Sequence, residues 1–396
     1  MRKLGATISL LALTLSSVGA QAEVETRGNV SLQLQAFPND SAHEEATQDS
    51  NFSLSSEIEI YAPVGENGSL TATPFIRIDE NDNERSRIDM REFIYSHYGD
   101  DWELNVGVGK VFWGVAESSN IVDVINQNDL VENDGSSAKL GQPMANLLLI
   151  RDWGDIDLYI LPGFRERTFP GISGRPRPGV VVDTNNAQFE SSEREKHVDF
   201  AGRIGMVFDE WDVGAHLFHG TARDPLFRIN SASNSVVPFY YQYTQLGFDI
   251  QATLESWLLK AELTYSSGDE IDDHSSIVSG FEYSFYDIKE SGVDLGIVAE
   301  WMYDERGEDS TDAFQNDLLI GLRLALNDEQ SLEGLLGIIT DLDEGGQLIT
   351  LEASRRFGSS LKGSLQMTVF EGVENDPAFA GFADEDNLQV ELSYFF

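Results

Sequence analysis

The chain has 396 residues, of which 68 are acidic and 26 basic, with a formal net charge of −42 and no cysteine. The lack of cysteine excludes disulfide bonds and thiolate metal sites. The strong negative charge argues against binding to nucleic acid or to anionic lipid surfaces. An acidic surface also suits proteins of salt-rich habitats, so the charge alone selects no partner.

The first residues have the three parts of a secretory signal. Two basic residues precede an apolar run over residues 4–18, and residues 20–22 read Ala-Gln-Ala. This order of a charged region, an apolar region and a small-residue cleavage site predicts a signal peptide over 1–22. Elsewhere no apolar run reaches the ~18 residues of a spanning helix. We therefore expect an exported protein whose mature part, 23–396, has no helical membrane anchor.

The mature part divides into about eighteen segments of roughly ten residues in which apolar and polar side chains alternate, as in strands of an outer-membrane barrel. Because these segments are numerous and no second domain is evident, a single large sheet is expected. The segments are 27–37, 50–62, 68–79, 87–98, 101–112, 144–153, 155–163, 198–208, 211–220, 238–254, 257–266, 277–288, 293–303, 313–326, 332–341, 347–357, 361–371 and 386–396.

The connections between these segments alternate in kind. Every second connection is short, and most of the others are long and polar. Short turns at one rim and long loops at the other are typical of outer-membrane barrels. The connection 342–346 fits poorly, because it belongs with the long set and is short, so the count is eighteen strands, or sixteen if it is off by two. The long connections are 38–49, 113–143, 164–197, 221–237, 268–276, 304–312 and 372–385.

The last ten residues carry the clearest strand pattern. One face holds Leu388, Val390, Leu392, Tyr394 and Phe396, and polar residues alternate with them. The pattern resembles the closing strand of bacterial outer-membrane β-barrel proteins, in which the barrel-assembly machinery recognises a terminal phenylalanine preceded by alternating apolar residues. The resemblance implies that the stretch from Leu388 to Phe396 binds that machinery. A soluble β-sandwich that ends on an alternating strand is the alternative.

Two further features favour a membrane barrel over a soluble sandwich. Trp102, Trp153, Trp211 and Trp257 all lie beside short turns, which predicts an aromatic girdle at one membrane interface. The inward-facing parity also carries more charges than a dry core can hold, and a water-filled lumen accounts for them. These inward candidates are Glu57, Glu59, Arg77, Glu103, Arg203, Asp249, Lys260, Glu262, Glu282, Asp294, Glu300, Arg323, Glu352, Arg356 and Lys362.

The most informative connection is the third outer loop, residues 113–143. Ser118 or Ser119 is placed to cap a short helix with one apolar side. In general porins the third outer loop folds into the lumen, where its carboxylates face wall arginines. This resemblance implies an inward-folded loop here, and a lid over the mouth is the alternative. The implied constriction residues are Glu117, Asp123 and Asp129 on the loop and Arg77, Arg91, Arg203 and Arg323 on the wall.

A second loop, over residues 164–179, concentrates positive charge in a chain that has little of it. Arginine binds carboxylate or phosphate groups in a bidentate manner, so an anionic solute or a lipopolysaccharide phosphate is one candidate ligand. Ion pairing with acidic loops, including Glu190, Glu193 and Glu195, is the interpretation that we favour. The basic side chains are Arg165, Arg167, Arg175 and Arg177.

The residues from Gly109 to Gly114, followed by Asp123 and Asn126, resemble a signature of a large uncharacterised group of proteobacterial porin-like proteins. The detailed resemblance covers about forty residues, and the barrel-level resemblance covers the mature chain. It implies an outer-membrane pore, leaves the solute open and supplies no catalytic residues.

Evidence for an enzyme is weak. The chain lacks the Gly-x-Ser-x-Gly motif and the glycine pattern of a phosphate loop. His216 and His219 are three apart on a predicted strand, so they face opposite sides and do not share a metal ion. The acidic runs 79–84 and 305–309 contain oxygen ligands of the kind that calcium prefers, but neither has the full twelve-residue loop. We expect no catalytic residue, metal ion or cofactor.

The sequence therefore predicts an all-β, transmembrane, antiparallel up-and-down barrel in a Gram-negative outer membrane. Its expected function is passive diffusion of small hydrophilic solutes and ions through a charged lumen. The alternatives are a non-conducting surface-binding or structural barrel and, less favoured, a barrel hydrolase that uses His216. Expected partners are outer-membrane lipid, lipopolysaccharide and the assembly machinery. Many porins form homotrimers, but no trimer interface is evident in the sequence.

Overall fold

The computed structural model describes residues 24–132, 138–230, 235–376 and 378–396. The predicted signal peptide, 1–22, lies outside these ranges. Among the described residues, no helix is long and apolar enough to cross a membrane.

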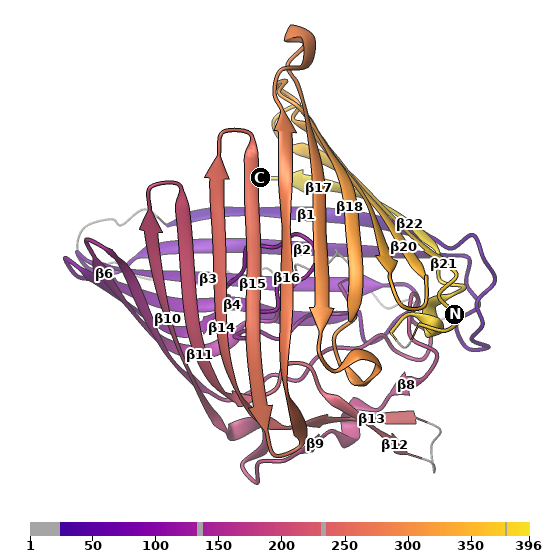
Figure 1. Ribbon diagram of the computed structural model, residues 1–396, viewed down its shortest axis with the longest axis horizontal. Coiled ribbons are helices and arrows are strands. Elements are labelled where there is room, and N and C mark those ends of the chain that lie inside the picture. The colour runs from indigo at the N-terminus through magenta and orange to yellow at the C-terminus, as the bar shows by residue number, and fades with distance from the viewer. Residues whose placement is uncertain (1–23, 133–137, 231–234, 377) are drawn as a thin grey trace, which may run out of the picture.

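Eighteen strands form one sheet that closes on itself (Figure 1). Each strand pairs antiparallel with the next one in the wall, and β1 pairs with β22 to close the ring. The predicted antiparallel barrel of about eighteen strands is confirmed. The wall strands are β1 Glu25–Ala36, β2 Ser50–Pro63, β3 Gly68–Asp79, β4 Arg87–Tyr98, β5 Trp102–Gly109, β6 Gln142–Arg151, β7 Gly154–Pro162, β10 Val198–Phe208, β11 Trp211–Thr221, β14 Gln242–Leu254, β15 Trp257–Gly268, β16 Ile271–Phe285, β17 Val293–Asp304, β18 Asn316–Leu326, β19 Leu332–Asp341, β20 Gln347–Phe357, β21 Leu361–Glu371 and β22 Asn387–Phe395.

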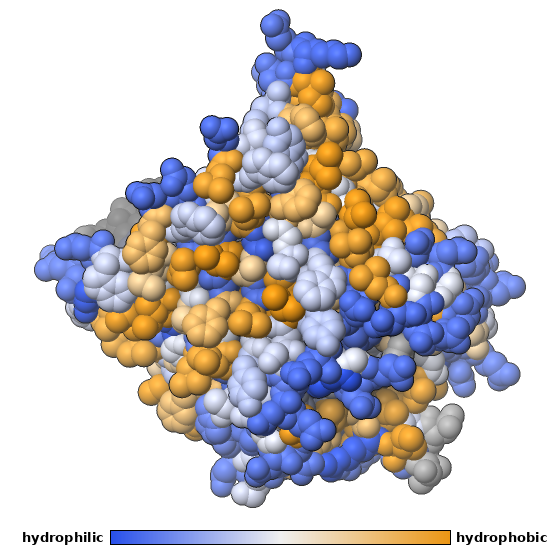
Figure 2. All heavy atoms as spheres, viewed as in Figure 1, coloured by the Kyte–Doolittle hydropathy of each residue, from blue (hydrophilic) through white to orange (hydrophobic). Residues whose placement is uncertain are grey.

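The closing seam shows how the alternating pattern builds the wall. Leu32 lies opposite Leu392 across the seam, and both side chains are 45% exposed on the outside. On the other face Ser31 and Ser393 are buried, and their hydroxyls are 2.8 Å apart. The outside is therefore apolar and the inside polar, the reverse of a soluble core. Figure 2 shows hydrophobic side chains across the middle of the wall and hydrophilic ones toward the turn and loop ends.

The tryptophans beside the short turns lie where the sequence places them. Trp153, Trp211 and Trp257 are 48%, 39% and 44% exposed, and each lies at or next to a short turn. Trp102 is half-buried, and its ring centroid is 5.5 Å from that of His97. Partly exposed indoles in one row are suited to the headgroup level of a bilayer.

Two predicted boundaries differ from the structure by more than three residues. The predicted loop 268–276 is a tight hairpin instead, because β16 begins at Ile271 and pairs with β15 beyond the apolar belt. A strand that extends into water needs no apolar face. Its sequence there is therefore mostly polar and has the composition of a loop. The predicted strand 238–254 is broken at Tyr241, where the chain leaves the wall. The short connection 342–346 does join β19 to β20, so the strand count needs no revision.

The long loops form structure of their own at one rim. Four short strands pair in a second sheet there, at the lower end of Figure 1. These strands are β8 Val181–Val182, β9 Gln188–Phe189, β12 Leu226–Asn230 and β13 Ser235–Tyr240. The connections also contain the single-turn 3-10 helices η1 Thr184–Asn186, η2 Arg194–Lys196, η3 Ile288–Glu290, η4 Gly307–Asp309 and η5 Ala380–Phe382.

Candidate pore constriction

The connection between β5 and β6 contacts the inner wall of the barrel at several points. Its described residues, 110–132 and 138–141, are called the inner loop below. Trp113, Val122 and Ile125 of this loop are at most 4% exposed and belong to an apolar cluster with wall residues such as Phe218 and Tyr159. The loop thus packs against β7 and β11 through a small core of its own.

Two buried glutamates of the wall bind the main chain of the inner loop. Glu262 of β15 accepts hydrogen bonds from the N–H groups of Val115 at 2.6 Å and Ala116 at 3.0 Å. Glu300 of β17 accepts from the N–H groups of Glu117 and Ser118 and from the Ser118 hydroxyl, at 2.7 to 3.0 Å. Both glutamate residues are 1% exposed. Charge-assisted hydrogen bonds in such a site are strong and directional.

These contacts explain why the predicted helix at Ser118 or Ser119 is wrong. Residues 117–128 form turns and bends instead. A helix N-terminus leaves N–H groups that need acceptors, and here carboxylates of the wall, rather than a serine cap, accept from the loop's N–H groups. The signal was present in the sequence as two inward-facing glutamates, but their distance from the loop along the chain hid the pairing.

The side chain of Glu117 faces a basic group on the wall. Its carboxylate is 2.6 Å from Arg323 of β18 and 3.7 Å from Lys260 of β15. Arg323 also pairs with Glu282 of β16 at 3.2 Å. Glu117 and Arg323, both predicted constriction residues, are therefore brought together, whereas Lys260 and Glu282 were not among the predicted site residues.

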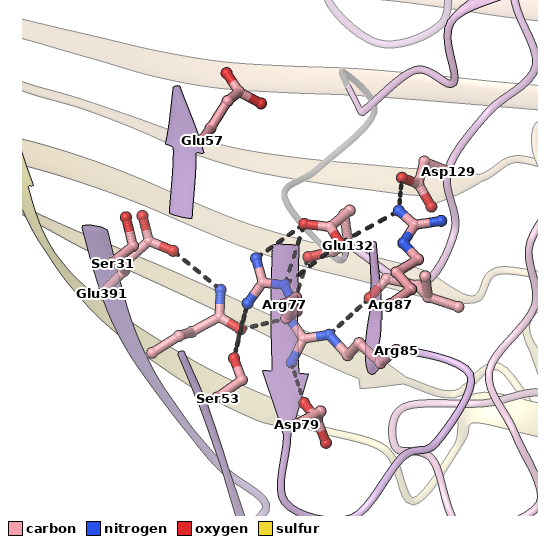
Figure 3. Close-up of polar contacts among 12 residues, drawn as sticks. Ser31, Ser53, Glu57, Arg77, Asp79, Arg85, Arg87, Asp129, Glu132 and Glu391 are labelled. Atoms are coloured by element: carbon pink, nitrogen blue, oxygen red, sulfur yellow. Dashed lines mark hydrogen bonds and ion pairs between the residues drawn. The ribbon is translucent and has the colours of Figure 1, made fainter. Parts of the chain in front are cut away.

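On the opposite wall, an arginine cluster surrounds Glu132 of the inner loop (Figure 3). The Glu132 carboxylate is 2.8 Å from Arg77 of β3, 3.2 Å from Arg91 of β4 and 3.3 Å from Arg87 of β4. Glu132 is buried, and Asp129 beside it pairs with Arg87. The structure therefore places predicted residues Asp129, Arg77 and Arg91 in one network, but its centre is Glu132.

Arg85 completes this network from the turn before β4. Its guanidinium pairs with Asp79 at 2.8 Å and donates to the Val131 carbonyl at 2.7 Å. Sequence reasoning missed Arg85 and Arg87. The available signal was the presence of four arginines within residues 77–91, in a chain with only 26 basic residues among 396. Asp79, in the acidic run 79–84, pairs with the Arg85 guanidinium.

The two remaining predicted constriction residues lie apart from these networks. Asp123 pairs within the inner loop, 3.2 Å from Lys139. Arg203 of β10 pairs with Asp249 of β14 at 2.5 Å, and its guanidinium lies over the Trp113 ring at 5.7 Å. Arg203 thus supports the loop through an aromatic contact, and its charge is already matched on the wall.

The arginines of the basic cluster contact the wall, another loop and their own main chain. Arg165 pairs with Asp89 at 2.9 Å, and Arg167 pairs with Asp224. The Arg177 guanidinium donates to the Pro178 carbonyl at 3.2 Å. The acidic residues named with this cluster have other partners: Glu190 accepts from the Gln242 N–H, and Glu195 pairs with Arg194.

Arg175 is the most enclosed member of that cluster. It pairs with Glu385 at 2.9 Å, and both side chains are at most 1% exposed. The same guanidinium donates to the carbonyls of Gln48 and Asp384 and lies 4.4 Å from the Phe37 ring. One side chain therefore joins the loops 37–49, 163–197 and 372–386.

Replacing Arg175 by alanine is expected to weaken this junction by about 3–5 kcal/mol, because Glu385 would stay buried without its partner. Limited proteolysis of the detergent-folded barrel should then cut the 37–49 and 372–386 loops faster. Arg194 is an exposed arginine on the same loop, so Arg194→Ala is the control. In this variant the protease should cleave the loops at the same rate as in the unmodified protein. Equal rates in both variants would contradict the proposed junction.

His216 and His219 lie on opposite faces of the wall, as the sequence predicts. His216 is buried with its ring centroid 5.1 Å from Trp113, and His219 lies on the other face beside the Thr244 hydroxyl. Within the described ranges, no group of three or more histidine, aspartate or glutamate side chains is arranged to hold a metal ion.

Comparison with known proteins agrees with the architecture. No protein-family model matches the chain, and no curated protein matches it. Among solved structures, OccK3 (OpdO) of Pseudomonas aeruginosa aligns over 94% of this chain and 96% of its own, with a TM-score of 0.55 and 10% identity. The chain has a porin fold. A BenF-like porin from Pseudomonas fluorescens Pf-5 aligns over 94% of this chain and 98% of its own, also with a TM-score of 0.55 and 10% identity. At this identity, the porin fold is what the likeness establishes.

Proposed function

We propose that this protein is an outer-membrane porin through which small hydrophilic solutes diffuse passively. The observation that carries the proposal is a closed barrel, apolar outside, whose inward-facing charges bind a loop from two opposite sides. A barrel of this strand number encloses an aqueous channel unless loops fill it. The inner loop then narrows the channel and sets the charges that a solute passes.

The constriction in this proposal has two unlike sides. Toward β3 and β4, guanidinium groups surround Glu132, and toward β15 and β18, Glu117 lies between Arg323 and Lys260. Arg323 and Glu117 keep 36% and 28% of their side-chain surface exposed, so they are the charges best placed to meet a solute. Glu117, Asp123, Asp129, Arg77, Arg91, Arg203 and Arg323 remain the proposed constriction set, to which Glu132, Lys260 and Glu282 are added.

The same proposal fixes the orientation in the membrane. The short turns face the periplasm, the long loops face outward toward lipopolysaccharide, and the signal at 1–22 directs export. The assembly machinery would recognise Leu388 to Phe396, where Phe396 and Gly28 exchange two backbone hydrogen bonds of 3.0 Å. A homotrimer is the assembly to test by cross-linking in the membrane.

The test is reconstitution of the folded barrel into a planar bilayer. Discrete conductance steps are expected, and the reversal potential under a salt gradient gives the sign of the ion preference. Heat-denatured protein in the same detergent is the control. A folded, heat-modifiable barrel that stays silent would overturn the porin proposal and favour a surface-binding protein.

A further inference from the structure

A large cavity lies between the inner loop and the long loops. Its volume is about 980 Å³, and it is lined by the inner loop, by the loop-side ends of β14, β15 and β16, and by residues within 222–227, 306–315 and 378–382 of the long loops, with Arg167 and Pro178. A volume of this size accommodates a whole small organic molecule. Under the proposed function, every solute that enters from the loop side meets this cavity before the constriction.

One side of the cavity is built from phenylalanine rings. Phe314, Phe379 and Phe382 all line it and are half-buried. The ring centroids of Phe314 and Phe379 are 5.8 Å apart, and those of Phe379 and Phe382 are 6.5 Å apart. Aromatic rings that keep part of their faces open present negative potential to a ligand. This wall, Phe314 with Phe379 and Phe382, is called the phenylalanine wall below.

Where the long loops line the cavity, the carboxylates are more exposed than the arginines that pair with them, whereas Asp123 and Asp129 of the inner loop, which also line it, are covered. The side chains of Asp224 and Asp312 are 38% and 37% exposed, and Glu308 is also exposed. Their basic partners are covered, because Arg167 and Arg306 are only 10% and 11% exposed. A solute beside the long loops therefore meets the Asp224 and Asp312 carboxylates, while the guanidinium groups of Arg167 and Arg306 are more covered.

Asp312 connects these two features. It is two residues from Phe314 on the loop between β17 and β18, and Asp224 is close enough for its charge to act on Asp312. Aromatic rings that line a cavity next to accessible carboxylates are a combination that binds organic cations. The rings and the carboxylates both attract the positive charge, and the rings also cover apolar groups around it.

We propose that this cavity is a binding site for organic cations, specifically amines or quaternary ammonium ions with an apolar substituent, held between the phenylalanine wall and the Asp224 and Asp312 carboxylates. The site rests on the proposed porin function and narrows its solute class. A weak site in the mouth raises the local concentration of the preferred solute without trapping it, as passive diffusion requires.

The protonation of Asp312 gives the site a pH dependence. Desolvation among the loops and the charge of Asp224 raise the pKa of Asp312 to about 7. Arg306, Asp304 and Arg167 also act on this carboxyl, and His274 lines the same cavity. Asp312 is charged above its pKa and neutral below it, so cation binding is expected to weaken as the pH falls from 8 to 6. In Asp312→Asn this dependence should be largely lost, which separates it from any contribution of His274.

The experiment is calorimetric titration of the detergent-folded barrel with benzyltrimethylammonium chloride at pH 8. Binding is expected. Choline is titrated as well, and 3,3-dimethylbutanol, its neutral isostere, should bind at least about fivefold more weakly than choline. Benzoate tests the opposite charge. Stronger binding of benzoate or equal binding of the neutral alcohol would overturn the cation site.

Variants locate the site. Asp224→Asn with Asp312→Asn should weaken benzyltrimethylammonium binding by about tenfold, and Phe379→Ala should weaken it severalfold. Asp309→Asn is the matched control, an exposed carboxylate on the same loop that does not line the cavity. If the control loses as much affinity as the double variant, the assignment is wrong. Should a variant fail to fold, the pH titration of the unmodified protein still decides the charge requirement.

Bilayer recordings separate this proposal from the porin proposal. Conductance steps that are recorded in potassium chloride and interrupted by added benzyltrimethylammonium would support both the pore and the cation site. If conductance steps are seen but benzyltrimethylammonium neither interrupts them nor binds in the calorimeter, the cation site alone is overturned. A silent barrel that binds the cation overturns the pore and leaves the site in place.

Discussion

Replacing Glu300 by alanine is expected to release the inner loop from the wall and to raise the single-channel conductance. The Glu117 and Ser118 N–H groups would lose their acceptor, because the carboxylate that binds both would be gone. Two charge-assisted hydrogen bonds are together worth about 3 kcal/mol. Hydrogen exchange at these two amides should therefore accelerate by about a hundredfold.

The control for that experiment is Glu103→Ala, which removes an inward-facing carboxylate of β5 close to the short turns. It should leave exchange at residues 117 and 118 unchanged. Glu300→Gln should give an intermediate result, because an amide oxygen still accepts but carries no full charge. If Glu300→Ala leaves both the exchange and the conductance at their unmodified values, Glu300 does not hold the loop.

Replacing Glu132 by alanine is expected to shift the reversal potential toward anion selectivity. Arg77, Arg87 and Arg91 would lose the carboxylate that lies within 3.3 Å of each of them. Removing one member of a buried ionic network costs about 3–5 kcal/mol, because the remaining charges stay out of water. The loop segment 129–132 should therefore also exchange faster. The reversal potential under a salt gradient measures the first effect.

The pH range of the Glu132 effect follows from its surroundings. Burial alone would raise the pKa of Glu132, but the charges of Arg77, Arg91 and Arg87 outweigh it and hold the pKa below the usual 4.5. The carboxylate therefore stays charged from pH 8 to 5, and its contribution is lost only as the pH falls below 4.5. Glu374→Ala, an exposed carboxylate of the last long loop, should leave the selectivity unchanged. An equal shift in both variants would show that net charge, and not the network, sets the preference.

The sequence predicts the wall well because a membrane barrel repeats one rule. Each strand needs apolar side chains at every second position, so Leu32, Leu392 and their equivalents reveal the strand and its outer face. This alternation is required only within the apolar belt on the outside of the barrel. The β15–β16 hairpin extends beyond this belt and resembled a loop, since water on both faces removes the alternation.

The constriction was less predictable because its partners are far apart in the chain. Glu262 and Glu300 could be recognised as inward-facing, but nothing local pairs them with main-chain N–H groups more than a hundred residues away. The same limit explains why the sequence predicts Glu117 and Arg323 at the constriction but does not predict Glu132, which lies at the centre of the arginine cluster. The resemblance to general porins implies an inward-folded loop, but only the structure identifies the wall residues that bind it.

The attachment of the inner loop through its main chain has a consequence for how this protein can change. Glu262 and Glu300 bind N–H groups that every amino acid except proline possesses, at positions 115 to 118. Side chains at positions 115 to 117 can therefore be exchanged without loss of these main-chain bonds, and at position 118 only the extra bond from the Ser118 hydroxyl to Glu300 would be lost. The side chains that line the pore can therefore change, by evolution or by protein engineering, while Glu262 and Glu300 keep the inner loop attached to the wall.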